Sequence, residues 1–93
     1  MDGFAIETER LDRAVRLRLQ GTLDGGAAYR LRDRILALDA PVIVDCSRLE
    51  RLSDFGLGIL AMAITEMNRE VEFVGLGHHA QRILRAFGLS RAA

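Results

Sequence analysis

Three residues whose side chains could act in catalysis, Cys46, His78 and His79, stand in contexts that favour a structural role. A thiol nucleophile needs a neighbouring base, and a histidine is a common one. Cys46 follows the apolar run Val42–Val44, however, where a free cysteine behaves as a small hydrophobic residue. Adjacent histidines point in different directions and lack the spacing of a metal-binding pair, so His78 and His79 are expected to begin a helix on the surface. We therefore expect no catalytic residue, no metal, no cofactor and no enzymatic activity.

Two acidic residues stand where sites are common in α/β proteins. Asp45 ends a β-branched run that is typical of a strand buried on both faces. Ser53 and Asp54 come directly before an apolar stretch, and either side chain would cap the start of a helix there. The carboxyl edge of an open sheet is a usual place for sites, and a helix amino terminus favours negative charge. The segment therefore predicts either a simple helix cap or a site for a charged group.

Phosphoryl chemistry finds little support in the sequence. No GxxxxGK[ST] loop is present, so the phosphate-binding loop of nucleotide hydrolases is excluded. A phosphoacceptor of the receiver type at Asp45 would need an acidic cluster for magnesium and a lysine. All 13 basic residues are arginines, so the lysine is missing.

Size and composition indicate one small globular domain spanning residues 1–93. Basic and acidic residues balance at 13 each, which gives no support for binding to nucleic acid. A single cysteine fits a reducing compartment. No apolar run reaches the ~20 residues of a membrane span, and the amino terminus lacks the pattern of a secretion signal. We expect a cytoplasmic protein that does not insert into a membrane.

The hydrophobic pattern predicts an α/β fold of about four strands and three main helices. Phe4 and Ile6 begin a short strand, and Val15, Leu17 and Leu19 alternate with polar residues in a second. These two strands form an antiparallel hairpin, and strand–helix–strand spacing predicts a parallel βαβ core after it. The remaining expected elements, in chain order, are a helix capped by Asp24 and running to about Leu38, a strand over Val42–Cys46, a loop over Ser47–Leu52, a helix after Asp54, a strand over Glu70–Leu76, and a helix from about Ala80 to Phe87 with Gly88 after it.

The helix after Asp54 has more apolar residues than one buried face requires. Leu57, Leu60, Ala61 and Ile64 form one stripe at helical spacing, which predicts the face that packs on the sheet. Phe55, Ile59 and Met62 fall on the other side. An exposed apolar patch beside a charged rim usually marks a partner site. The alternative, that a further helix covers this patch, stays open at the level of sequence.

Three stretches between about Val15 and Leu89 resemble the STAS family, the anti-sigma factor antagonist domain. They are GTLDGGAAYRLRDRIL, VDCSRLERLSDFGLGIL and VGLGHHAQRILRAFGLS. The middle stretch resembles the family pattern of a strand ending in Asp-x-Ser, a short loop, and Asp-Ser-Ser/Thr/Ala-Gly-Leu-Gly opening a helix. The residues that match by position are Asp45, Ser47, Gly56, Leu57 and Gly58. The resemblance implies a mixed sheet with helices.

The resemblance also implies a protein-binding module that regulates transcription in bacteria. Family members of the sigma branch dock on an anti-sigma factor that is also a serine kinase, and phosphorylation of the serine after the motif aspartate breaks the complex. Ser53 stands in place of that aspartate, Asp54 in place of the phosphorylated serine, and Phe55 in place of the next small residue. Asp54 is thus the phosphoacceptor equivalent, with one carboxylate in place of a phosphate. Ser53 offers a displaced hydroxyl as an alternative acceptor.

From these observations we expect partner binding through the surface Ser53–Met62, with Phe55, Ile59 and Met62 as apolar contacts and Asp54 setting the charge requirement. The expected partner is an anti-sigma factor or serine kinase. The alternative is an accessory role on the ATPase of an ABC-type lipid transport system, which some members of the family have. Many relatives continue with another strand, so the last parallel strand is expected to be a bare edge that pairs with a partner or in a homodimer.

Overall fold

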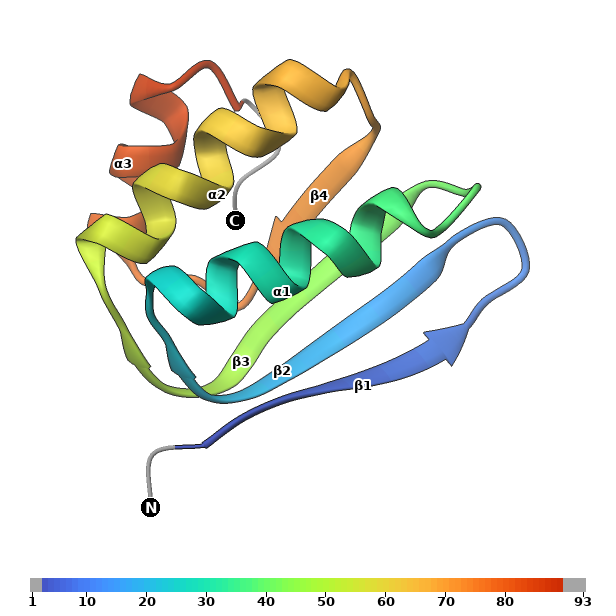
Figure 1. The fold of residues 1–93 in the computed structure, drawn as a ribbon, viewed down its shortest axis with the longest axis horizontal. Coiled ribbons are helices and arrows are strands. Elements are labelled where there is room, and N and C mark those ends of the chain that lie inside the picture. Colours follow the sequence, from blue (N-terminus) through green and yellow to red (C-terminus); the bar gives the residue numbers. More distant parts are fainter. Residues whose placement is uncertain (1–2, 90–93) are drawn as a thin grey trace.

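The structure, a computed structural model, describes residues 3–89. It contains β1 (Phe4–Arg10), β2 (Val15–Leu23), α1 (Gly25–Leu36), β3 (Val42–Leu52), α2 (Asp54–Met67), β4 (Val71–Val74) and α3 (His78–Ala86) (Figure 1).

The four strands form one mixed sheet in the order β1-β2-β3-β4. β1 and β2 pair antiparallel, from Phe4 opposite Gly21 to Arg10 opposite Val15. β3 pairs parallel with β2 on one side and with β4 on the other, with α1 and α2 as the connections. The three helices lie on the same side of the sheet (Figure 1). This confirms the expected α/β fold with an antiparallel hairpin and a parallel βαβ core.

Alternation along β2 shows how the sequence divides the two faces of the sheet. Val15, Leu17 and Leu19 are at most 2% exposed and face the helices, whereas Arg16 and Arg18 face the other way and are partly exposed. Side chains alternate across a strand, so a period of two separates an apolar face from a wet one. Each fully buried leucine or isoleucine contributes about 1.5–3 kcal/mol relative to an exposed one.

α1 begins and ends close to the positions that its sequence predicts. Asp24 caps it, with Oδ1 accepting a hydrogen bond from the Ala27 amide at 2.9 Å. The helix ends at Leu36, two residues before the expected end. The Arg69 guanidinium, which follows α2, donates hydrogen bonds to the carbonyl oxygens of Leu36 and Leu38, so the end of α1 is tied to the end of α2.

The expected loop over Ser47–Leu52 is wrong, because β3 continues through Leu52. Its extension pairs with the extension of β2, from Gln20 opposite Arg48 to Leu23 opposite Leu52. Two register shifts interrupt this ladder. The first lies between the pairs Arg18–Asp45 and Gln20–Arg48, next to Ser47. Polar residues in the segment suggested a loop, but backbone pairing with β2 and partial burial of leucine side chains hold it as a strand.

The last two elements match the sequence with small differences at their ends. β4 covers Val71–Val74 rather than Glu70–Leu76, because Gly75 adopts φ +78° and turns the chain. Gly88 follows α3 at φ +92°. The Leu89 amide donates to the Leu84 oxygen at 3.1 Å. This confirms the glycine helix terminator and its hydrophobic successor.

Candidate functional site

The start of α2 is fastened to the end of β2 by Ser53. Its hydroxyl oxygen accepts a hydrogen bond from the Gly56 amide at 2.9 Å and donates one to the Leu23 carbonyl at 3.3 Å. The Ser53 amide also donates to the Leu23 oxygen, at 3.1 Å. Ser53 is therefore the N-cap of α2, and phosphorylation of its hydroxyl would remove the hydrogen bond that it donates to the Leu23 carbonyl.

Gly56 lets α2 approach the connection between β2 and α1. A Cβ atom at this position would lie 2.7 Å from the Leu23 oxygen and 2.8 Å from the Asp24 oxygen. Gly58, two residues later, has open space where a Cβ would stand. Leu57 between them is 1% exposed and belongs to the core. In the Gly-Leu-Gly motif, Gly56 therefore makes a close backbone contact and Leu57 contributes to the core. Packing does not explain why a glycine is present at position 58.

Asp54 is the first residue of α2, and its carboxylate faces solvent beside α3. Its Oδ1 and Oδ2 lie 3.0 and 3.3 Å from Nε2 of His79, and both side chains are more than two-thirds exposed. Exposed pairs of this kind contribute little to stability. Both residues were expected at helix starts, but their contact with each other was not predicted. The two helix starts lie close together because the helices follow neighbouring parallel strands, whose carboxyl ends lie at the same edge of the sheet.

The apolar residues of the expected partner surface are accessible. Phe55 is 74% exposed and Met62 is 54% exposed, whereas Ile59 is half-buried and packs partly on the core. The Phe55 ring lies over the first turn of α1, where a Cβ at Gly25 would be 2.9 Å from the ring. Leu57, Leu60, Ala61 and Ile64 form the buried stripe, as expected. Within the described part of the chain, no further helix covers Phe55 and Met62.

A groove between α1 and α2 continues this surface. Its volume is about 440 Å³. The residues that line it are Tyr29, Arg32 and Leu36 from α1, and Ile59, Met62, Ala63, Glu66 and Met67 from α2. The α1 residues were not among the predicted site residues, because they lie outside the inward stripe of that helix. Tyr29, Arg32 and Leu36 stand at i, i+3 and i+7, so the sequence shows that they share one side of α1 but not that α2 lies beside them.

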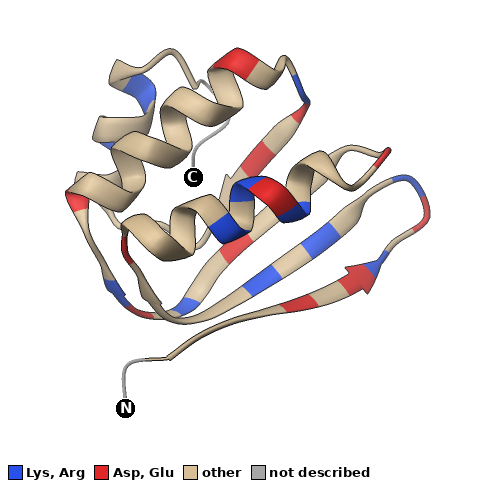
Figure 2. Cartoon of the chain, viewed as in Figure 1, with Lys and Arg blue, Asp and Glu red and all other residues tan. Residues whose placement is uncertain are grey.

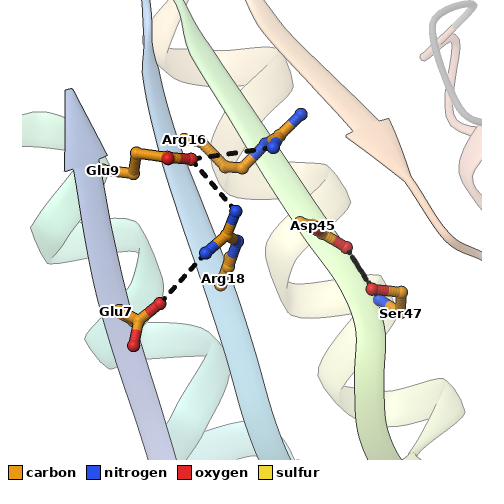
Figure 3. Close-up of polar contacts among 6 residues, drawn as sticks. All are labelled: Glu7, Glu9, Arg16, Arg18, Asp45 and Ser47. Atoms are coloured by element: carbon orange, nitrogen blue, oxygen red, sulfur yellow. Dashed lines mark hydrogen bonds and ion pairs between the residues drawn. The ribbon is translucent and has the colours of Figure 1, made fainter. Parts of the chain in front are cut away.

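Asp45 and Ser47 lie on the face of the sheet opposite to the helices (Figure 3). Asp45 Oδ1 accepts hydrogen bonds from the Ser47 hydroxyl at 2.7 Å and from the Ser47 amide at 3.0 Å. These bonds hold the pKa of the Asp45 carboxyl below its usual value. The Asp-x-Ser motif therefore shapes the backbone where the β2–β3 register shifts.

The same face carries a network of ion pairs between β1 and β2 (Figure 3). Arg18 contacts Glu7 at 3.3 Å and Glu9 at 3.2 Å, and Arg16 contacts Glu9 at 3.6 Å. These arginines and acids sit directly opposite each other in the antiparallel register. Cross-strand pairs of opposite charge stabilise that register and keep the sheet face wet.

Cys46 is 5% exposed, and burial raises its pKa to about 12. A buried thiol of this kind stays protonated and is a poor nucleophile at neutral pH. His78 and His79 begin α3, as expected for surface residues. Among residues 3–89 no group of three or more His, Cys, Asp or Glu side chains is arranged to hold a metal ion. None of the helices described has the length and apolar character needed to cross a membrane.

Residues 6–91 match a family described as Mlab, STAS domain. The chain belongs to the STAS family. This confirms the resemblance inferred from the sequence. No curated protein sequence matches the chain at a significant level.

Solved STAS structures share the fold. An anti-sigma factor antagonist from Mycobacterium paratuberculosis is 26% identical, with a TM-score of 0.70 over 95% of this chain and 80% of that chain. An antisigma-factor antagonist STAS domain from Rhodobacter sphaeroides is also 26% identical, with a TM-score of 0.57 over 77% of this chain and 86% of that chain. The anti-sigma factor antagonist SpoIIAA, in its unphosphorylated form, is 19% identical with a TM-score of 0.67, over 96% of this chain and 86% of that chain.

Proposed function

We propose that this protein is a non-enzymatic regulatory module that binds a protein partner through the surface from Ser53 to Met62. The observation that carries this proposal is the exposure of Phe55 and Met62 beside the Asp54 carboxylate. Binding of a partner that covers these two large apolar side chains removes them from water, which lowers the free energy. Membership of the STAS family and likeness to anti-sigma factor antagonists support a regulatory role. The partner class favoured by these likenesses is an anti-sigma factor or serine kinase.

Asp54 gives the start of α2 a permanent negative charge in this proposal. It occupies the position that the family resemblance assigns to a phosphorylated serine, and its carboxylate is accessible except for the contact with His79. Ser53 is a weaker candidate for modification, because its hydroxyl caps α2 and also binds the Leu23 carbonyl. The partner therefore meets a fixed charge at this position, and Asp54 selects partners that tolerate or pair with it.

The second candidate is an accessory subunit of an ABC-type lipid transport system. The matching family carries the description Mlab, STAS domain, which does not name an anti-sigma factor antagonist. Asp54 is also compatible with a branch of the family that does not use a phosphorylated serine. Neighbouring genes discriminate cheaply: transporter genes beside this one support the second candidate, and a sigma factor or kinase gene supports the first.

The test is affinity purification from the native cell, with mass spectrometry of both bait and prey. We expect one regulatory kinase or transport ATPase to co-purify with the wild-type chain and to be lost with Met62→Glu. Leu11→Glu is the matched control, because Leu11 is also exposed, at 39%, but lies in the β1–β2 turn. Circular dichroism establishes that both variants fold. Equal recovery of the partner with Met62→Glu and with wild type would contradict the proposal.

A further inference from the structure

The α1–α2 groove extends the accessible apolar surface beyond the residues of α2. Tyr29 is 48% exposed and Leu36 is 46% exposed, and both lie on the α1 wall. Six large hydrophobic side chains are exposed in the described part of the chain. Four of them, Tyr29, Leu36, Phe55 and Met62, line this groove or stand at its entrance. Exposed apolar area is therefore concentrated on one face.

The two helices that form the groove run side by side from their starts to their ends (Figure 1). At the start, the first residue of α1, Gly25, lies against Phe55 and Ile59. At the other end, Arg69 after α2 binds the carbonyl of Leu36, the last residue of α1. On the α2 side the groove is lined from Ile59 to Met67, and a rise of ~1.5 Å per residue makes this wall about 12 Å long.

Charge is sparse in this groove and balanced in sign. Of its lining residues, only Arg32 and Glu66 are charged. Figure 2 shows no charged residue in α2 between Asp54 and Glu66. Arg32 stacks on the Tyr29 ring, with 4.9 Å from its guanidinium carbon to the ring centre, and donates hydrogen bonds to Asp33. An occupant with an apolar stripe, one acid and one base complements these walls, whereas a strongly charged occupant does not.

The walls also decide the backbone conformation of an occupant. Both are helices, whose N–H and C=O groups are bonded within each helix except at the ends. The groove thus has no row of free backbone groups of the kind that a sheet edge gives to an added strand. An extended segment buried here would leave its own backbone groups unpaired, at a cost in free energy. A helix satisfies those groups internally and packs its ridges between the two walls.

We propose that the α1–α2 groove binds an amphipathic helix of the partner protein, about two to three turns long. Its apolar side chains lie between Tyr29 and Leu36 on one wall and Ile59 and Met62 on the other. An acidic residue of the helix faces Arg32, and a basic residue faces Glu66. This inference rests on the proposed function and adds the helical form of the partner segment and the role of α1.

The experiment places a photo-crosslinking phenylalanine derivative in the full chain, in the native cell, separately at Leu36, Phe55 and Leu11. Crosslinked partner peptides are then identified by mass spectrometry. We expect Leu36 and Phe55 to capture the same partner, and Leu11 to capture none. A synthetic peptide of the segment captured by Leu36 is expected to bind the purified chain and to gain helical circular dichroism on binding.

Variants of the purified chain test the contact with that same peptide. Leu36→Glu and Met62→Glu, one on each wall, are each expected to weaken peptide affinity at least tenfold, and Leu11→Glu to leave it unchanged. Thermal unfolding shows which variants keep the fold, and either wall variant alone suffices for the comparison.

The outcomes separate this inference from the proposed function. Capture of the partner by Phe55 but not by Leu36 overturns the groove inference and leaves the proposed function standing. Failure at both positions overturns both. Capture of a second copy of this chain at Leu36, or of a segment that binds without becoming helical, also overturns the inference.

Discussion

Two accessible surfaces of this protein differ in the side chains that they expose to water. One is the outer face of the sheet, and the other is the α1–α2 face. The outer sheet face, which the helices do not cover, presents Arg16 and Arg18 in ion pairs with Glu7 and Glu9 (Figure 3). The α1–α2 face instead leaves aromatic and aliphatic side chains in water, with a groove of about 440 Å³ between them.

The difference indicates on which surface the binding of a partner would be more favourable in free energy. Covering the ion-paired face would remove charges from water, and their mutual attraction often fails to offset that cost. Covering Phe55, Met62 and their neighbours removes apolar area from water at about 25 cal/mol per Å². The proposal of a binding site on the α1–α2 face therefore rests on exposed apolar groups that lie together, not on exposure alone.

The largest expected effect is a loss of partner binding when the α1–α2 face is changed, compared with a change on the outer sheet face. Phe55→Glu should weaken partner binding by at least about tenfold, because a charge replaces a large apolar contact. The double variant Arg16→Gln with Arg18→Gln should bind within a factor of about two, since neither arginine lies on the proposed surface. Calorimetry with the purified partner measures both. A larger loss in the arginine variant would reverse the comparison.

The second prediction concerns the backbone contact that positions α2. Gly56→Ala should destabilise the fold by roughly 2 kcal/mol, because its Cβ would meet the Leu23 and Asp24 oxygens below 3 Å. Gly58→Ala, with open space at its Cβ, should instead stabilise by about 0.5–1 kcal/mol through helix propensity. Urea unfolding compares the pair. Equal stabilities would show that α2 does not approach the β2–α1 connection this closely.

The third prediction tests the role of Ser53. Ser53→Ala should lower the free energy of unfolding by about 1 kcal/mol, because the Gly56 amide loses its capping oxygen. Ser53→Asp should recover most of that loss, since aspartate is also a good N-cap. Chemical denaturation of the three proteins provides the measurement. A stability of Ser53→Ala equal to wild type would argue against the capping role.

The smallest expected effect lies on the outer sheet face. A double-mutant cycle between Arg18 and Glu7 should give a coupling of about 0.2–1 kcal/mol, because the pair is partly exposed. The coupling should shrink further at ~1 M salt, where the screening length falls to about 3 Å. Unfolding of the four proteins at low and high salt gives these values. A coupling that persists in salt would mean that this face is less open to solvent than its exposure indicates.

Much of the fold was predictable from local patterns, and the errors have a common cause. Alternation in β2 and helical spacing in α2 reflect burial on one face, which a single segment records by itself. The extension of β3 through Leu52 was missed because its pairing partner lies on β2, distant in sequence. Tyr29 and Leu36 were missed because a residue outside the inward stripe of one helix gains meaning only beside a second helix.

The sequence by itself determined the α/β fold, a side-chain cap at Ser53 or Asp54, the buried stripe of α2 and the apolar residues left over, because these depend on side-chain type and period within one segment. Tertiary structure alone decided that Asp54 meets His79, that Asp45 and Ser47 lie on the face of the sheet opposite to the helices, and that α1 and α2 enclose a groove. These features join residues from different elements. Their distances depend on strand order and helix placement, which no single stretch of sequence encodes.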